Sequence, residues 1–258
     1  MTKKTYFISD AHLGSLMIEN PKEQEKLLVA WLDEIKHDAE ALYMLGDMFD
    51  FWHEYKLVVP RGYTRFLGKL AELSDMGIAI HFFIGNHDLW VSDYLEKEIG
   101  ITVHKKPIIT EIHGKKFFLA HGDGLGDPSK NFKFKLWLFH NRLAQRLFSA
   151  LHPRIGVGLG LAWSKNSRKK KNGNIAEYTY LGEDKEHLVQ FAKAYTGEHI
   201  DYFVFGHRHI ILDLMLKNKS RVLIIGDWLK LFSYAVFDGE NIYIEEYQSP
   251  LNPPKGDF

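Results

Sequence analysis

The sequence contains no cysteine, so neither disulfide bonds nor thiolate metal sites are available to it. Its first residues lead straight into a strand-like pattern and lack the apolar core and small-residue cleavage site of a signal peptide. The longest apolar stretch, residues 155–163, is interrupted by glycines and falls far short of the roughly 20 residues that cross a bilayer. These absences favour a cytoplasmic protein that does not span a membrane.

The sequence also lacks net charge, since 33 basic and 33 acidic residues balance over 258 positions. The balance is uneven along the chain, because residues 129–176 hold eleven lysines and arginines and no acidic residue. The remainder therefore carries 22 basic against 33 acidic residues, a net charge of minus eleven. A basic segment within an acidic body indicates a local anionic partner, such as phosphate, nucleic acid or a lipid surface.

Apolar and β-branched runs of strand length recur along the chain. They lie at residues 5–9, 41–45, 78–84, 116–120, 201–205, 221–225 and 233–237. Helix-period stretches at 21–37, 61–76 and 183–195 separate several of these runs, and the first two have a proline at or just before their start. Strands that alternate with helices predict an α/β fold, and the length is typical of one domain with or without an insertion.

From about residue 201 the pattern becomes strand-rich, and we expect a second, mixed sheet there. Residues 238–241 are predicted to form the turn of a hairpin between 233–237 and 242–247. The proline-rich tail at 249–258 has no periodicity and is expected to be extended or disordered.

Five short polar motifs each follow a predicted strand directly. They are Asp10-Ala11-His12, Gly46-Asp47-Met48-Phe49-Asp50, Gly85-Asn86-His87-Asp88, His121-Gly122-Asp123 and Gly206-His207-Arg208-His209. Because the carboxyl ends of strands in open α/β sheets face the ligand crevice, motifs far apart in the chain are expected to converge on one site. Each motif alone also fits a capping aspartate beside an incidental histidine, or an Asx turn. All five together at strand ends favour a shared metal site.

The candidate ligands combine carboxylate, amide and imidazole groups, a mixture that suits manganese, iron, cobalt or zinc better than magnesium or calcium. They are Asp10, His12, Asp47, Asn86, His121, His207 and His209. Seven side chains exceed the needs of one ion, which favours two divalent ions about 3.5–4 Å apart with Asp47 as the bridge. Two such ions activate a water and clamp phosphate oxygens, so the motifs predict phosphoester hydrolysis.

Further residues of the motifs have predicted roles beside the metals. His87 is expected to protonate the leaving group or bind a phosphate oxygen as a catalytic residue. Asp50 and Asp88 are expected to orient the ligands through hydrogen bonds. The nine histidines outside the motifs have no such context and are interpreted as surface or core residues. The pair Asp227-Trp228 is interpreted as a turn and left out of the site.

Together the five motifs resemble the signature of the calcineurin-like metallophosphoesterase superfamily, over residues 10–209. The resemblance implies a four-layer α/β sandwich of two mixed sheets flanked by helices, a manganese-type dinuclear centre, and hydrolysis by an activated water without a covalent intermediate. It also implies two ligand sets that share one carboxylate. The first set is Asp10, His12, Asp47 and His209, and the second is Asp47, Asn86, His121 and His207.

Within the superfamily the chain is similar to the family of UDP-2,3-diacylglucosamine hydrolases, which release UMP and 2,3-diacylglucosamine 1-phosphate in lipid A biosynthesis. Residues 6–13, 121–125 and Asn166-Ser167 carry this similarity. It implies one phosphoesterase domain over 1–248, with a helical cap over about 128–176 that contacts a lipid-linked nucleotide.

Two departures concern the substrate: His87 stands where well-studied members have an arginine, and residues 168–171 are more basic than the family's stretch. The candidate substrate contacts are Asp127, Trp137, Phe139, Leu143, Ser167, Arg168 and Lys171.

Large apolar residues alternate with lysines and arginines from residue 130 to 163, in a basic amphipathic pattern. Such a segment lies in the interface of an anionic membrane, or packs its apolar face on the body as a cap. The two interpretations are compatible, because a cap that binds acyl chains needs apolar surface. The first predicts a peripheral protein on the inner face of the cell inner membrane.

The same motifs serve other functions. A nuclease, a cyclic nucleotide phosphodiesterase or a protein phosphatase would use the same metals, and the basic segment would also suit nucleic acid. The aliphatic residues interleaved in that segment favour a lipid over stacked bases, so no nucleic-acid partner is expected. A non-catalytic binding scaffold would have lost metal ligands, whereas all seven ligand types are present.

Overall fold

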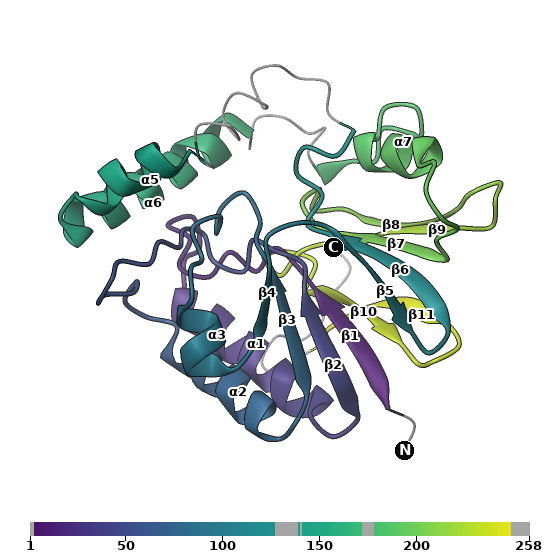
Figure 1. Ribbon diagram of the computed structural model, residues 1–258, viewed down its shortest axis with the longest axis horizontal. Coiled ribbons are helices and arrows are strands. Elements are labelled where there is room, and N and C mark those ends of the chain that lie inside the picture. The colour runs from purple at the N-terminus through teal and green to yellow at the C-terminus, as the bar shows by residue number, and fades with distance from the viewer. Residues whose placement is uncertain (1–2, 127–138, 140, 172–177, 249–258) are drawn as a thin grey trace, which may run out of the picture.

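Two mixed β-sheets pack face to face, and helices cover their outer surfaces (Figure 1). The structure is a computed structural model that describes residues 3–126, 139, 141–171 and 178–248, and within these ranges all side chains except those of 142 and 167–171. The layers follow one another as helices, first sheet, second sheet and helix. The architecture confirms the α/β class and the four-layer sandwich implied by the resemblance.

The first sheet has six strands in the order β11-β10-β1-β2-β3-β4. Its strands are β1 (Lys4–Ile8), β2 (Ala39–Met44), β3 (Ala79–Phe83), β4 (Thr102–His104), β10 (Ser233–Phe237) and β11 (Ile242–Glu246). Strands β1 to β4 run parallel, whereas β10 pairs antiparallel with β1 and places Val236 opposite Tyr6. Three helices cover its outer face: α1 (Pro21–Ile35), α2 (Thr64–Asp75) and α3 (Tyr94–Ile99).

The second sheet has five strands in the order β5-β6-β7-β9-β8. They are β5 (Ile108–Ile112), β6 (Lys115–Ala120), β7 (Tyr202–Phe205), β8 (Ile211–Met215) and β9 (Arg221–Ile225). Strands β6, β7 and β9 run parallel, and β5 and β8 pair antiparallel at the two edges. Helix α7 (His187–Ala194) packs Leu188, Val189 and Ala192 on its outer face.

Aromatic side chains fill the space between the two sheets. Phe7 of β1 stacks on Tyr43 of β2 at 5.3 Å between ring centroids and on Phe117 of β6 at 5.7 Å. Phe237 of β10 meets Phe117 edge to face at 5.1 Å. Large buried rings of this kind contribute strongly to core stability. They hold the sheets together in an orientation that brings the carboxyl ends of β1, β2, β3, β6 and β7 to one edge of the sandwich (Figure 1).

The start of α1 agrees with the prediction, since Pro21 is its first residue. The second predicted helix is confirmed as α2, but its start differs, because α2 begins at Thr64, after Pro60, and Tyr63 before it has a left-handed backbone. A tertiary contact satisfies the free N–H groups at the N-terminus of α2: the Glu25 carboxylate accepts hydrogen bonds from the backbone N–H groups of Arg65 at 2.9 Å and Phe66 at 3.2 Å. A carboxylate provided by a different helix leaves no local sequence signal.

The second sheet was expected to form from the strands after about residue 201, but its strands differ from that expectation. It takes β5 and β6 from before residue 201, while the confirmed hairpin β10–β11 adds to the first sheet beside β1. A two-stranded hairpin can extend either sheet, and only the pairing partner of its first strand decides between them. Strands β4, β5 and β8 and helix α3 were not anticipated, because they are short or half-exposed and their apolar patterns are weak.

The basic insertion forms a helical hairpin in its described part. Helix α5 (Arg142–Ser149) and helix α6 (Pro153–Lys171) lie side by side over the end of the first sheet where the motif loops are (Figure 1). Glycines allow α6 to approach the body: a Cβ atom at Gly160 would lie 2.3 Å from the Phe51 ring, while one at Gly158 would meet nothing within 4 Å. None of the helices described is long and apolar enough to cross a bilayer.

Candidate metal centre

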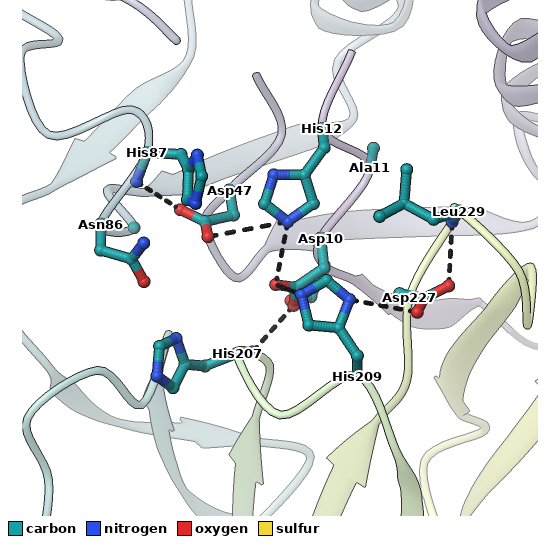
Figure 2. A network of polar contacts seen from close by, with 12 residues as sticks. Asp10, Ala11, His12, Asp47, Asn86, His87, His207, His209, Asp227 and Leu229 are labelled. Atoms are coloured by element: carbon teal, nitrogen blue, oxygen red, sulfur yellow. Dashed lines mark hydrogen bonds and ion pairs between the residues drawn. The ribbon is translucent and has the colours of Figure 1, made fainter. Parts of the chain in front are cut away.

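The five motifs converge as their places in the sequence predict. Each begins directly after a strand, in the order β1, β2, β3, β6 and β7, so both sheets contribute side chains to one site. Figure 2 shows the carboxylates of Asp10 and Asp47 pointing toward the imidazoles of His12, His87 and His209, with Asn86 and His207 at the rim. The convergence is a consequence of the fold, because parallel strand ends share one edge.

The backbone is strained where the candidate ligands sit. Nine non-glycine residues of the described chain have a φ angle in the left-handed region, and five of them are candidate ligands. These are Asp10, His12, Asp47, His207 and His209, with φ between 43° and 69°. A left-handed backbone costs an L-residue about 1–2 kcal/mol, so the clustering of such residues among the candidate ligands indicates a functional site and not a requirement of core packing.

The glycines of two motifs are required by close approach of neighbouring chain segments. A Cβ atom at Gly85 would lie 2.2 Å from Asp47 Oδ1, and one at Gly206 would lie 2.6 Å from Asp10 Oδ2. Carboxylates of one strand end therefore press on the backbone of the next. The backbone N–H groups of His87 and His207 use this proximity to donate to Asp47 Oδ1 and Asp10 Oδ2, each at 2.8 Å.

Asp47 lies at the centre of the cluster and is only 2% exposed. Its Oδ2 atom is 3.4 Å from Nε2 of His121 and 3.7 Å from Nε2 of His12. Three groups of donor atoms lie within 4.8 Å of one another, and Asp47 belongs to two of them. The groups are Asp10-His12-His209, His12-Asp47-His87 and Asp47-His121-His207. A carboxylate that serves both ends of the cluster is what a bridging ligand requires.

Two histidines are oriented so that Nε2 faces the centre. His121 Nδ1 lies 2.8 Å from the carbonyl oxygen of Leu45, and His209 Nδ1 lies 3.1 Å from Asp227 Oδ2. Because both partners are acceptors, each Nδ1 carries the proton and donates it. Nε2, the ring nitrogen that remains for a metal, then points at Asp47 in His121 and at Asp10 in His209, at 3.4 Å and 3.5 Å. Hydrogen-bonded carbonyls and carboxylates orient metal-binding imidazoles in this way.

The electrostatics of the candidate ligands favour a bound cation. Burial alone would lower the pKa of the His121 imidazole, but the Asp47 carboxylate raises it well above its ordinary value. Burial likewise opposes ionisation of Asp47, yet His121 and its neighbouring imidazoles hold the pKa of that carboxyl well below its usual range. Asp10 Oδ1 is buried and has no hydrogen-bond donor among the described residues. These residues fit divalent cations, which the mixed oxygen and nitrogen donors would bind.

Asp88 anchors two of the motif loops. Its carboxylate accepts from the backbone N–H groups of Gly85 at 2.7 Å, Met48 at 2.8 Å, and Asp47 and Phe49 at 3.3 Å. Burial and the nearby Asp47 carboxylate raise the pKa of Asp88 to about 7, and the four N–H donors oppose that shift by favouring the ionised form. The side chain lies where an orienting group was predicted.

Asp50 also lies where an orienting group was predicted, with Oδ1 3.6 Å from Nδ1 of His12. Its Oδ2 accepts a hydrogen bond at 2.7 Å from Ser164 Oγ, a fully buried hydroxyl of the cap helix α6. Ser164 was not anticipated, because a single serine on a helix has no motif context. The cap is therefore hydrogen-bonded to the site and not only laid over it.

The interpretation of Asp227 as a turn alone was wrong. Its Oδ1 atom does accept from three turn N–H groups, of Leu229, Lys230 and Leu231, at 2.8 to 3.1 Å. Its Oδ2 atom faces His209 Nδ1, which makes Asp227 the orienting partner of a candidate ligand (Figure 2). The sequence did contain a signal for this role of Asp227: the residue follows strand β9, and that strand ends at the same edge as β7.

His87 sits beside the candidate ligands and is buried. Its Nδ1 lies 3.0 Å from the backbone oxygen of Asp50, so Nδ1 donates a proton there. The ring meets that of His12 edge to face at 4.8 Å. Nε2 is the remaining ring nitrogen, free of that bond, and it is the atom with which His87 would serve a substrate.

The candidate substrate contacts fall into three groups. Phe139 lines an apolar pocket next to Asn86 and His87, whereas Leu143 is 65% exposed and does not line that pocket. Ser167, Arg168 and Lys171 belong to α6, but their side chains are not among those described. Asp127 and Trp137, like the tail at 249–258, lie outside the described residues.

The chain is similar to several known proteins. The model of the calcineurin-like phosphoesterase family matches residues 3–210. A UDP-2,3-diacylglucosamine hydrolase from Porphyromonas gingivalis is 48% identical, over 96% of this chain and 99% of its own length. One from Edwardsiella ictaluri is 30% identical, over 98% of this chain and 95% of its own. Among solved structures, a phosphoesterase from E. coli matches with a TM-score of 0.45 and 16% identity, over 94% of this chain and 92% of that chain.

We predict that Asp47→Asn binds fewer than two divalent ions per chain and loses hydrolytic activity about a hundred-fold or more, because Asn keeps one oxygen but loses the negative charge and replaces the other oxygen with an NH2 group, whose nitrogen cannot ligate. His87→Ala should keep its ions and lose about a hundred-fold in rate, because it removes a proton donor and not a ligand. Metal analysis and phosphodiester hydrolysis of the two purified variants test the contrast. Full metal content in the first variant, or metal loss in the second, would show that the roles are misassigned.

A second prediction concerns Asp227→Asn. The side-chain amide would keep Oδ1 for the turn N–H groups and turn an N–H donor toward His209 Nδ1, which opposes the tautomer that leaves Nε2 free to ligate. We expect metal affinity to fall by about 10- to 100-fold, measured by titration of the apoprotein with Mn²⁺. Asp238→Asn is the matched control, because that carboxylate also accepts turn N–H groups, of Glu240 and Asn241, but hydrogen-bonds to no histidine among the described residues. An equal loss of Mn²⁺ affinity in both variants would show that Asp227 serves only the turn.

Proposed function

Because this chain belongs to the calcineurin-like phosphoesterases, we propose that it hydrolyses the pyrophosphate of UDP-2,3-diacylglucosamine to UMP and 2,3-diacylglucosamine 1-phosphate, a step of lipid A biosynthesis. The relative from Porphyromonas gingivalis that bears this activity in its name aligns over nearly the whole of both chains. The observation that carries the proposal is an apolar pocket that opens beside the candidate metal ligands.

The pocket has a volume of about 300 Å³ and lies between the cap and the body. The cap contributes Phe139, Phe148, Leu159, Gly160 and Trp163, and the body contributes Phe51, Trp52, Asn86, His87, Leu89 and Trp90. Almost all of these side chains are apolar or aromatic. At its inner end the pocket reaches Asn86 and His87, so a group bound there would be attached to a phosphate at the metals.

An acyl chain is the ligand that best matches such a lining. Burial of each methylene contributes about 0.8 kcal/mol, so a few methylenes outweigh a surface ion pair. A nucleic acid or a phosphopeptide has no comparable apolar part to place there. The pocket therefore favours a lipid substrate over the other reactions that the metal site supports.

The side chains of the site divide the work of hydrolysis. The seven candidate ligands would hold two divalent ions, which we propose to be Mn²⁺ and which when bound supply Lewis acidity and an activated water. Asp47 and Asp10 provide the negative charge that holds them, and Asp227 and Asp50 fix the imidazoles of His209 and His12. His87, with Nδ1 bonded to Asp50, would hold a proton on Nε2 and pass it to the leaving phosphate oxygen.

The decisive assay places the purified protein with Mn²⁺ against UDP-2,3-diacylglucosamine, cyclic nucleotides and DNA in parallel. We expect cleavage of the lipid nucleotide, with UMP as a product, and little turnover of the others. Cleavage of DNA or cyclic nucleotides in place of the lipid would overturn the proposed substrate and leave the metal chemistry intact.

We predict that Phe148→Ser raises KM for the diacyl substrate in detergent about ten-fold or more, because it puts a hydroxyl in the apolar pocket. The loss on a small soluble diester, bis(p-nitrophenyl) phosphate, should be much smaller. Leu147→Ser is the matched control: this neighbouring side chain is 64% exposed and does not line the pocket. Equal losses on both substrates in a folded Phe148 variant would mean that the cap supports the fold without selecting a lipid.

We also propose that the outer face of the cap rests on an anionic membrane. Five of its apolar side chains are 40–65% exposed: Leu143, Leu147, Ile155, Leu159 and Trp163. The segment that carries them has arginines and lysines but no acidic residue, as an anionic bilayer surface requires. Leu159 and Trp163 line the apolar pocket as well, so its mouth opens onto this face and acyl chains would pass directly from bilayer to site.

This placement predicts that the wild-type protein sediments with anionic vesicles and that added salt weakens the binding. Leu147→Ser combined with Ile155→Ser should lower vesicle partitioning about ten-fold by removing apolar contact, while activity on detergent-dispersed substrate stays within a factor of two. Undiminished partitioning of the double variant would exclude this face as the membrane contact.

A further inference from the structure

A second pocket lies next to the candidate metal centre, and the proposed function has not assigned it a role. It has a volume of about 180 Å³, and its wall includes His121, one of the candidate ligands. It shares Leu89 with the apolar pocket, so the Leu89 side chain stands between the two spaces. A substrate whose phosphates lie at the metals would thus meet a different pocket on each side of this residue.

The chemistry of the second pocket contrasts with that of the apolar one. His104, Lys105, Lys106 and Asp123 line it together with His121. Within the part of the chain that the structure describes, no hydrogen bond or ion pair engages the ammonium group of Lys105 or of Lys106. Two uncommitted cations beside a phosphate-hydrolysing centre favour an anionic, hydrogen-bonding ligand.

Aromatic surface is present in the same pocket. The His104 ring stacks on Phe83 with centroids 4.6 Å apart and an interplanar angle of 29°, and both residues line the wall. His81 also contacts His104, with Nδ1 of His81 3.0 Å from Nε2 of His104. Burial lowers the pKa of His104, which keeps the ring neutral and suited to packing against a planar base.

A wider groove continues from this pocket toward the cap. The groove has a volume of about 910 Å³ and shares Ile84, Leu89 and Lys105 with the pocket. It adds Gln145 and Arg146 of α5. Polar side chains of the cap thus line a groove together with Lys105, while Phe139, Phe148, Leu159 and Trp163 of the cap line the apolar pocket.

We propose that the pocket lined by His104, Lys105 and Lys106 binds the nucleoside monophosphate half of the substrate. The inference rests on the proposed function and adds to it the place of each substrate half. A pyrophosphate at the metals has two substituents, which extend from it in different directions. The diacyl half belongs in the apolar pocket beside Asn86 and His87, so the nucleoside half takes the polar pocket beside His121.

The test uses UMP and 2,3-diacylglucosamine 1-phosphate as competing inhibitors of bis(p-nitrophenyl) phosphate hydrolysis by the manganese-loaded full-length protein. In the double variant Lys105→Ala/Lys106→Ala, the inhibition constant of UMP should rise about ten-fold, while that of the lipid phosphate changes by less than two-fold. KM for UDP-2,3-diacylglucosamine should rise with the UMP constant. Lys3→Ala/Lys217→Ala is the matched control, since these exposed lysines lie at the opposite ends of their strands from the site.

The outcomes separate the two proposals. If the wild-type protein cleaves UDP-2,3-diacylglucosamine but the Lys105/Lys106 variant keeps the wild-type UMP constant, the pocket assignment is wrong and the proposed function stands. A selective rise in the constant of the lipid phosphate would place the lipid half there and would also overturn the assignment. If the wild-type protein hydrolyses the small diester but neither cleaves the lipid nucleotide nor binds UMP, the proposed function itself fails.

Discussion

Burial of the Asp47 carboxylate where the two sheets meet is the constraint on which the rest of the structure depends. An isolated charge in a protein interior is very costly unless it is paired and hydrogen-bonded. Asp47 meets this condition only with help from both sheets: His12 follows β1 of the first, and His121 follows β6 of the second. The sandwich therefore has to bring these strand ends within a few ångströms, and the aromatic core between the sheets holds them there.

The close approach of these strand ends imposes strain on the backbone. Five candidate ligands adopt left-handed conformations, and the glycines that precede Asn86 and His207 admit carboxylates where a Cβ atom would collide. The carboxylate of Asp88 offsets part of this cost by accepting four backbone N–H groups from two loops. Strain of this kind persists only where the surroundings over-determine it. The surrounding structure thus fixes the candidate ligands in place, as a preorganised hydrolase requires.

The location of the site could be predicted from the sequence, because it follows from a topological rule. A polar motif directly after a buried strand lies at the carboxyl edge of its sheet whatever the strand order, so His12, Asp47 and His121 were expected together. The partners that fix them follow no such rule. Ser164 reaches Asp50 only because of how α6 docks, and Asp227 serves a turn and His209 with its two oxygens. The sheet to which β10 and β11 belong was equally unpredictable, since a pairing partner leaves no trace in a hairpin's own sequence.

The cap contacts both the apolar pocket and the candidate metal centre. Ser164 of α6 donates to Asp50, Asp50 faces His12, and four residues away on the same helix Gly160 lets α6 approach Phe51 closely enough to wall the apolar pocket. A ligand that shifts α6 would therefore shift a hydrogen bond at the candidate metal centre, so under the proposed function the fit of the acyl half and the geometry of the reacting centre are coupled. Leu89 adds a second condition, because it divides an apolar space from a cationic one. A molecule that is apolar on one side of its phosphates and polar and planar on the other satisfies both, whereas a detergent or a free nucleotide satisfies only one.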